Sequence, residues 1–229
     1  MNCMSRWPSV RFKSHVNSRF NGDVLNAPSP DSRKKVAREA AMLLYSGAEK
    51  EYKQAKLKAA KTFNLHYMPT NLEVAMELDQ IAEENEAPAR QERLVRMRQE
   101  ALRIMRMLGE YDPVLVGSVW RGTIHRESDI DIIVHHEEPR EIMKLLEKNR
   151  LAVTGSERAV VTKRGKTKDT FHIHVDSPVG DKVEVIVHSP EEACLTQKCE
   201  IYGDEISGLR IQELEKILRE DPQRRFVPS

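Results

Sequence analysis

Cysteine is scarce in this chain, with only three among its 229 residues, at Cys3, Cys194 and Cys199. Such a sparse and odd-numbered set argues against a disulfide framework and favours a reducing compartment, so we expect a cytoplasmic protein. Cys194 and Cys199 lie five residues apart, and no second Cys or His pair has zinc-finger spacing. We therefore interpret them as ordinary thiols.

Long apolar runs and an excess of one charge are absent as well. No apolar run approaches the ~20 residues that a helix needs to cross a bilayer, so we expect no membrane span. The 37 basic and 36 acidic residues leave a net charge of +1, so any contact with nucleic acid must come from local basic patches. Hydrophobic residues make up 39% of the chain, which is enough for a core.

The first part of the chain, residues 1–28, carries four lysine or arginine residues before its first acid, Asp23. It lacks the apolar stretch of about 7–15 residues that marks a secretory signal. An acid-poor, basic start is compatible with a transit peptide, but the amphipathic pattern is weak. We expect a flexible leader.

Helical periodicity occupies residues 29–109. Ser29 and Pro30 suit the cap and the first position of a helix, and later periodic runs cover 48–62, 71–81 and 89–108. We expect an all-helical N-terminal region whose long helices offer a surface for oligomers. The last run has apolar residues at alternating spacings of three and four, typical of a packed helix pair: Leu94, Met97, Ala101, Ile104 and Leu108.

The pattern changes at residue 110. Helical patterns at 139–148 and 209–218 accompany short apolar runs, and residues 221–229 are expected to be a loose tail. The fold class is therefore α+β, a domain of short strands over 110–229 with C-terminal helices, preceded by the all-helical region. The apolar runs that predict strands are 114–116, 130–134, 159–161, 171–175 and 183–187.

Two aspartates stand two residues apart at the second predicted strand. Alternate residues of a strand share a face, so Asp129 and Asp131 can both reach one small site. Carboxylates this close raise each other's pKa unless a cation lies between them, and Mg²⁺ prefers carboxylates together with substrate phosphates. The pair predicts a divalent-metal site, with two surface aspartates on an edge strand as the alternative.

A Gly-Ser turn precedes this pair. Gly117 lets the backbone approach a ligand closely, Ser118 can donate to a phosphate oxygen, and a helix beginning there adds its positive end. Arg121 and Arg126 lie between the turn and the aspartates, where each either neutralises phosphate or pairs with a nearby acid. We predict nucleotide binding here, with a simple tight turn as the alternative.

Glu184 is the candidate for a third acid. It interrupts the apolar strand 183–187, and an unpaired buried carboxylate is costly. It would ligate metal or accept the proton of an attacking hydroxyl, unless it faces outward on a half-exposed strand. Asp176, on the preceding strand, is the reserve. His172 and His174 share a face of that strand, and we interpret them as polar residues on a solvent face, with contact to the site or metal binding as the alternative.

These residues resemble a known family. The runs 116–123 and 128–134 are similar to the Gly-Ser…Asp-x-Asp signature of the DNA polymerase β nucleotidyltransferase superfamily, including CCA-adding-like and small stand-alone members. The third carboxylate of that family lies on a later strand between apolar residues, as Glu184 does, although Asp is usual there. The resemblance covers about residues 113–188 and implies a small mixed sheet backed by helices.

The resemblance also implies a two-metal nucleotidyltransferase. Asp129, Asp131 and Glu184 would bind two Mg²⁺ ions, with Mn²⁺ as the alternative, and Gly117 and Ser118 would hold the β and γ phosphates. An NMP would pass from an NTP, which we expect to be ATP, to an acceptor hydroxyl with release of pyrophosphate.

The acceptor is open between RNA, a protein and a small molecule. The rival function is a catalytically silent module of the same fold that binds RNA or a helical protein partner. Retention of all three acids argues against it, because a silent copy has no need of them. RNA is favoured by basic stripes on predicted helices, formed by Lys50, Lys53, Lys61, Arg96 and Arg103.

Overall fold

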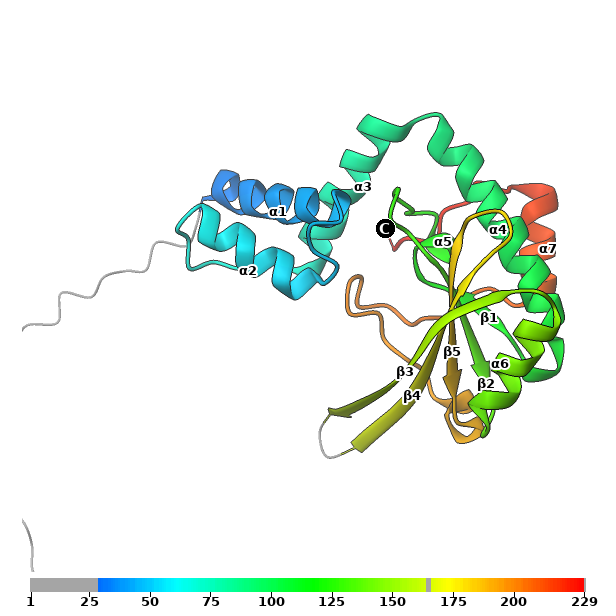
Figure 1. Cartoon of the computed structure of the whole chain (residues 1–229). Helices are drawn as coiled ribbons and strands as arrows, with labels where there is room; N and C mark the ends of the chain where they lie inside the picture. Colours follow the sequence, from blue (N-terminus) through cyan, green and yellow to red (C-terminus); the bar gives the residue numbers. More distant parts are fainter. Residues whose placement is uncertain (1–28, 164–165, 229) are drawn as a thin grey trace, which may run out of the picture.

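The computed structural model describes residues 29–163 and 166–228, so the predicted leader and Cys3 lie outside the described residues. Figure 1 shows the first three helices as a group that stands beside the rest of the fold. The local sequence fixes where they begin, because Ser29 caps the first helix and Thr70 forms a capping box with Glu73 at the third. These helices are α1 (Pro30–Tyr45), α2 (Tyr52–Thr62) and α3 (Asn71–Glu86).

The described residues form two separate hydrophobic cores. The first joins α1, α2 and α3, largely through alanines such as Ala40 and Ala59. The second contains the sheet together with α4 (Ala89–Met107). The apolar seam of α4 packs against the sheet and α7 (Ile211–Glu220). The cores therefore divide at the α3–α4 turn, whereas the sequence grouped α4 with the helical region.

The sheet has five strands in the order β1-β2-β5-β4-β3. β2 and β5 run parallel, and every other neighbouring pair is antiparallel, so the sheet is mixed. This architecture confirms the predicted α+β class. The strands are β1 (Val114–Val116), β2 (Ile130–His135), β3 (Ala152–Lys163), β4 (Lys166–Asp176) and β5 (Lys182–His188).

The two faces of the sheet differ. On one face, alternate apolar residues of β2 and β5, such as Ile132 and Val185, are fully buried. Helices α4, α6 (Pro139–Lys148) and α7 gather on this side, as Figure 1 shows. Asp131 and Glu184 alternate with these buried residues along their strands, so they project from the other face of the sheet. Both are only partly buried.

The C-terminal segment packs over α5 (Gly117–Arg121), the short helix that follows β1. Trp120 stacks on Phe226 with ring centroids 6.4 Å apart, and the Phe226 amide donates to the Arg121 carbonyl. Arg225 also forms an ion pair with Asp79 of α3. The expectation of a loose tail is therefore wrong for residues 221–228, because an aromatic ring and several polar contacts fasten it.

Arg98 of α4 ties this segment to the core. Its side chain is fully buried, and its guanidinium donates to the carbonyl oxygens of Val119, Trp120, Pro222 and Arg224 over 2.8–3.1 Å. Burial lowers the pKa of Arg98 to about 10, so the group still carries its charge at neutral pH. One cation thus joins α4, α5 and the C-terminal segment.

The remaining described segments are short. Two 3-10 helices, η1 and η2, cover Gly109–Tyr111 and Pro190–Cys194. Cys199 carries a free thiol. Within residues 29–163 and 166–228, no helix combines the length and apolar character that a bilayer crossing requires.

Arg98→Met should destabilise the fold strongly. The substitution keeps an apolar stem but leaves four carbonyl oxygens without their donor, so we expect a loss of at least about 3 kcal/mol in the free energy of unfolding. Urea denaturation measures this loss. Arg106→Met is the matched control, because Arg106 of the same helix is exposed and pairs only with Glu215. The control should lose no more than about 1 kcal/mol, and equal losses would contradict the role of Arg98.

Candidate active site

Two of the three predicted acids lie side by side. β2 and β5 are parallel neighbours, and their register pairs Asp131 with Glu184. Paired residues of neighbouring strands project to the same face, here the face that α4, α6 and α7 leave uncovered. Asp176, the reserve, pairs instead with Lys182 where β4 ends. The structure therefore places Glu184, and not Asp176, next to Asp131.

The carboxyl group of Asp131 lies in a strongly perturbed environment. Burial raises its pKa well above the usual range, and the negative charges of Glu184 and Asp129 raise it further. A hydrogen bond between the carboxyls of Asp131 and Glu184 acts in the same direction, because it requires a shared proton. A proton or a cation between these two side chains would relieve their repulsion.

Asp129 lies just before β2, at the rim of this pair, and is exposed. Partial desolvation raises the pKa of its carboxyl, and the charge of Glu184 adds to that effect. The ammonium groups of Lys182 and Lys50 act in the opposite direction. Asp129 therefore interacts electrostatically with both acids of the pair and with two lysines.

Gly117 touches the acid pair directly. β1 and β2 are paired so that Val116 lies opposite Asp131, and Gly117 follows with φ at +70°. A Cβ atom at this position would lie 1.9 Å from the Oδ2 atom of Asp131. Only glycine permits both this left-handed backbone and this close approach. The turn predicted to bind phosphate is thus in contact with one of the predicted metal ligands.

Ser118 follows Gly117 in α5 and is partly buried. Its carbonyl accepts from the amides of Gly122 and Thr123, which closes the short helix. Its hydroxyl has no hydrogen-bond partner among the described residues. The side chain therefore remains available to a ligand beside the acid pair.

Arg121 does not join the acids. Its guanidinium donates to both carboxylate oxygens of Asp204, at 2.7 and 3.1 Å, and to the Phe226 carbonyl. It also lies between the rings of Trp120 and Tyr202, 4.4 and 4.5 Å from their centroids. The side chain is 5% exposed, so these contacts correct the expectation that it neutralises a triphosphate.

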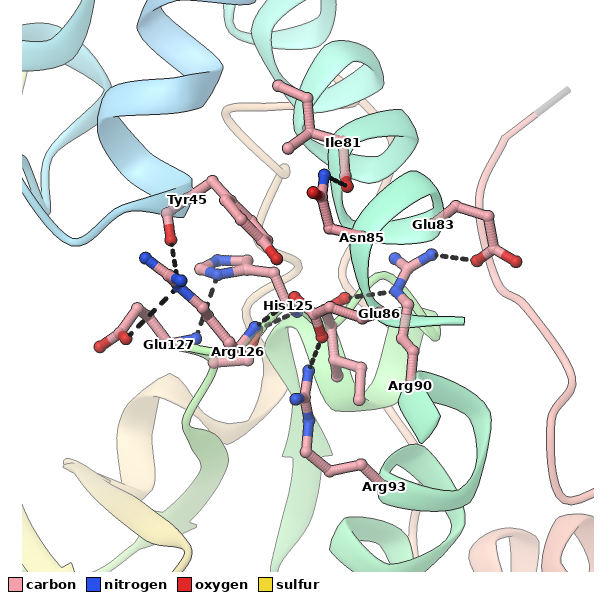
Figure 2. A network of polar contacts seen from close by, with 12 residues as sticks. Tyr45, Ile81, Glu83, Asn85, Glu86, Arg90, Arg93, His125, Arg126 and Glu127 are labelled. Atoms are coloured by element: carbon pink, nitrogen blue, oxygen red, sulfur yellow. Dashed lines mark hydrogen bonds and ion pairs between the residues drawn. The ribbon is translucent and has the colours of Figure 1, made fainter. Parts of the chain in front are cut away.

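The Arg126 side chain also makes its contacts away from the acid pair. Its Nε atom donates to the Tyr45 carbonyl at 2.9 Å, and its guanidinium lies 4.7 Å from the centre of the Tyr45 ring. Figure 2 shows this side chain directed at the end of α1, with the neighbouring Glu86 bonded to its backbone amide. Its contacts therefore connect the loop before Asp129 to the helical region and give no support to a role in binding nucleotide.

Lys182 is a site residue that the sequence did not identify, and His172 is one that the sequence offered only as an alternative. The Nδ1 atom of His172 lies 2.8 Å from Oε1 of Glu184, and its Nε2 atom lies 3.0 Å from the Thr170 hydroxyl. The interpretation of His172 as a solvent-facing residue is therefore wrong. Lys182 stands two residues before Glu184 and near Asp129. Lys182 could have been predicted, because residues two apart on a strand share a face and Lys182 stands two before Glu184. The position of His172 depends on the β4–β5 register, which the sequence does not reveal.

The basic residues expected to contact RNA are not equivalent. Arg96 pairs with Asp181 at 2.9 Å and Arg103 with Glu100 at 2.6 Å, so their charges are balanced within the protein. Three members of the set are exposed and have no ion pair among the described residues, and these are Lys50, Lys53 and Lys61.

The donor set fits a hard divalent cation in its chemistry. Asp131 and Glu184 supply two desolvated, mutually repelling carboxyls, and Asp129 adds a third nearby. As the side chains stand, no group of three His, Cys, Asp or Glu residues within the described ranges is already arranged to hold a metal ion. The close part of the set is the Asp131–Glu184 pair, and the exposed Asp129 carboxylate would have to approach it.

A cavity of about 750 Å³ lies elsewhere, beside α6. Met143, Phe171 and Val187 line it, together with charged residues such as Arg140. Phe171 and Val187 are paired on β4 and β5 and project to the face opposite the acids. None of the predicted site residues lines this cavity, so it is separate from the candidate active site.

The mixed sheet, the Gly-Ser turn and the paired carboxylates together define a site of the nucleotidyltransferase type. Residues 98–216, more than half of the chain, match the family model of the nucleotidyltransferase domain. The chain belongs to this family, which confirms the resemblance inferred from the sequence. Nucleotidyl transfer is the activity that this membership supports.

Two solved structures are similar to part of the chain. One is a cytoplasmic RNA terminal U-transferase, with 14% identity, a TM-score of 0.26, and coverage of 51% of this chain and 34% of that one. The other is the Cid1 poly(U) polymerase with bound MgGTP, with 14% identity, a TM-score of 0.28, and coverage of 51% and 38%. The matched region thus spans little more than a third of either structure. The comparison with curated proteins found no match.

Asp131→Asn should stabilise the metal-free protein at neutral pH. The pKa of Asp131 is raised in the folded state, so its contribution to stability is full below the unfolded pKa of about 3.9 and is lost as pH rises through the folded pKa. Asparagine removes that loss. We expect a thermal midpoint a few degrees above wild type at pH 7 and no difference near pH 3. Asp176→Asn, at an exposed acid, should change neither midpoint.

Gly117→Ala should disable the site. The added methyl group must displace the Asp131 carboxylate, and the left-handed backbone costs a non-glycine residue about 1–2 kcal/mol. We expect loss of nucleotide-dependent thermal protection with the fold retained, measured by circular dichroism and thermal melts. Gly109→Ala is the control, because a Cβ there meets nothing within 4 Å. Normal protection of the Gly117 variant would show that the close approach is dispensable.

Proposed function

We propose that this protein is a divalent-metal-dependent nucleotidyltransferase that moves an NMP from an NTP to an acceptor hydroxyl and releases pyrophosphate. One observation carries the proposal. Asp131 and Glu184 are paired in register on neighbouring strands, and Gly117 lies in contact with Asp131. A phosphate-binding turn in contact with repelling carboxylates is suited to a substrate that is a metal–phosphate complex.

Each residue of the cluster has a proposed role. Asp129, Asp131 and Glu184 would hold Mg²⁺, which when bound neutralises phosphate charge and polarises the reacting oxygens. The Gly117 backbone and the Ser118 hydroxyl would orient the β and γ phosphates. His172 holds the Glu184 carboxylate through a hydrogen bond of 2.8 Å. The exposed Asp129 has the rotational freedom to turn toward the cation.

The balance of the transfer is simple. The acceptor oxygen forms a bond to the α-phosphorus, and the bond from that phosphorus to the pyrophosphate oxygen breaks. The hydroxyl proton leaves to a carboxylate of the cluster or to water. The chain itself supplies orientation and charge, and no covalent intermediate with a side chain is required.

We propose ATP as the nucleotide and RNA as the acceptor. RNA is favoured because Lys53 and Lys61 of α2 are exposed and without ion pairs among the described residues, as a phosphate backbone requires. Arg96 and Arg103 are left out, because Asp181 and Glu100 balance their charges.

Incubation with each α-phosphate-labelled NTP, Mg²⁺ and cellular RNA tests this function. We expect label to enter RNA, and Asp131→Asn to lower the rate at least about a hundredfold, since the metal ions supply several kcal/mol of transition-state stabilisation. Asp176→Asn is the control and should keep the wild-type rate, because Asp176 lies on the same face of the sheet but outside the acid cluster.

The outcomes separate the alternatives. Label that enters protein or a small molecule would retain the activity but replace the acceptor. Wild-type transfer by the Asp131 variant would remove the carboxylates from the mechanism. No transfer and no metal-dependent nucleotide binding would favour a silent module that binds RNA or a helical partner.

A further inference from the structure

The helical region rests on the loop that leads to Asp129. Arg126 of this loop donates through Nε to the Tyr45 carbonyl at 2.9 Å, where α1 ends. Its backbone amide donates to Oε1 of Glu86, the last residue of α3, at 2.9 Å. Figure 2 shows both contacts meeting at this one residue. Two helices of the region are thus fastened three residues before Asp129.

Further contacts place the segment between α1 and α2. Gly47 lies against the Glu127 side chain, whose carboxyl carbon is 3.6 Å from where a Cβ of Gly47 would stand. At the other end of the segment, Tyr52 at the start of α2 is partly buried near Tyr202 and Cys199, and this burial raises its pKa. The Asn71 side chain also donates to the Glu200 carbonyl at 3.2 Å. The α1–α2 segment is therefore packed at one end against the loop before Asp129 and at the other near residues 199–202.

Lys50 lies in the middle of this segment, between the contacts of Gly47 and Tyr52. Its side chain is exposed, and no hydrogen bond or ion pair within the described ranges occupies its ammonium group. Its charge nevertheless acts on Asp129, as does that of Lys182 from the start of β5. Lys58, by contrast, is neutralised by Glu49 at 3.0 Å. The helical region thus contributes a positive charge that acts on Asp129 from a segment packed against the loop before it.

We propose that the helical region completes the active site by placing Lys50 where it contacts, together with Lys182, the β- and γ-phosphate oxygens of the nucleotide. The inference rests on the nucleotidyl transfer proposed above. Arg126 is a positioning residue in this arrangement, because it holds both the Asp129 loop and the end of α1.

The position of Lys50 favours the nucleotide triphosphate over an RNA backbone as its ligand. Lys50 belongs to the segment that packs on the loop before Asp129, and Lys182 lies on the same strand face as Glu184. Both lysines are therefore near acids proposed to bind metal, and Mg²⁺ joins such acids to substrate phosphates. A compact ammonium group is also a common partner of the outer phosphates of a nucleotide. Lys53 and Lys61, further along α2, are the candidates for contact with the acceptor.

Equilibrium dialysis with labelled ATP and Mg²⁺, without acceptor, tests the proposal on the full chain. Lys50→Gln should weaken ATP binding about tenfold, the order expected when one hydrogen bond to a charged group is lost. AMP binding should stay unchanged, because AMP lacks the β and γ phosphates. Lys50→Arg should restore most of the affinity. Lys53→Gln, an equal change of charge on the same exposed surface, is the matched control and should bind ATP normally.

The possible results distinguish a failure of the Lys50 role from a failure of the proposed nucleotidyltransferase function. Equal ATP affinity of wild type and the Lys50→Gln variant would overturn the role of Lys50 and leave the transferase standing. Equal weakening by Lys53→Gln, or a loss that AMP shares, would assign the effect to general electrostatics and also overturn it. If the wild type binds no NTP with Mg²⁺, the proposed function fails as well. Unchanged thermal midpoints of the variants exclude misfolding as a cause.

Discussion

The repulsion between two carboxyl groups on adjacent strands is the constraint around which this fold is arranged. Parallel pairing of β2 and β5 puts Asp131 beside Glu184, and the burial of Asp131 weakens the screening of their repulsion by water. A buried pair of like charges persists only with a proton or a cation between its members. The open face of the sheet is therefore a site that is completed by positive charge.

The surrounding residues supply that charge in part and leave room for more. His172 bonds to Glu184, while the charges of Lys182 and Lys50 act on Asp129. Gly117 brings the backbone against Asp131 without a side chain in the way. Metal and phosphate are the ligands that such an arrangement can use, which is consistent with membership of the nucleotidyltransferase domain family.

The N-terminal helices have a place in this arrangement because they pack against the loop that leads to Asp129. Arg126 joins the end of α1 to the residues just before Asp129, and the C-terminal segment joins α3 to α5 through Arg225 and Phe226. Arg121 and Arg126, which the sequence suggested as phosphate ligands, serve these connections instead. An arginine that offers five donors and a flat cation is equally suited to either use, so its neighbours decide.

The sequence by itself determined the elements and the core of the site. The period-two pattern around Asp131 and Glu184, and the glycine between β1 and α5, are local features, so they predicted the mixed sheet, the family and the candidate acids. Tertiary structure decided what depends on contacts between distant segments. These are the parallel register that pairs Glu184 rather than Asp176 with Asp131, the packing of α4 on the sheet, the anchored C-terminal segment, and the packing of the α1–α2 segment against the loop before Asp129. The spacing of residues along the chain determines which side chains share a face of a helix or strand. It does not determine which of these faces pack against each other.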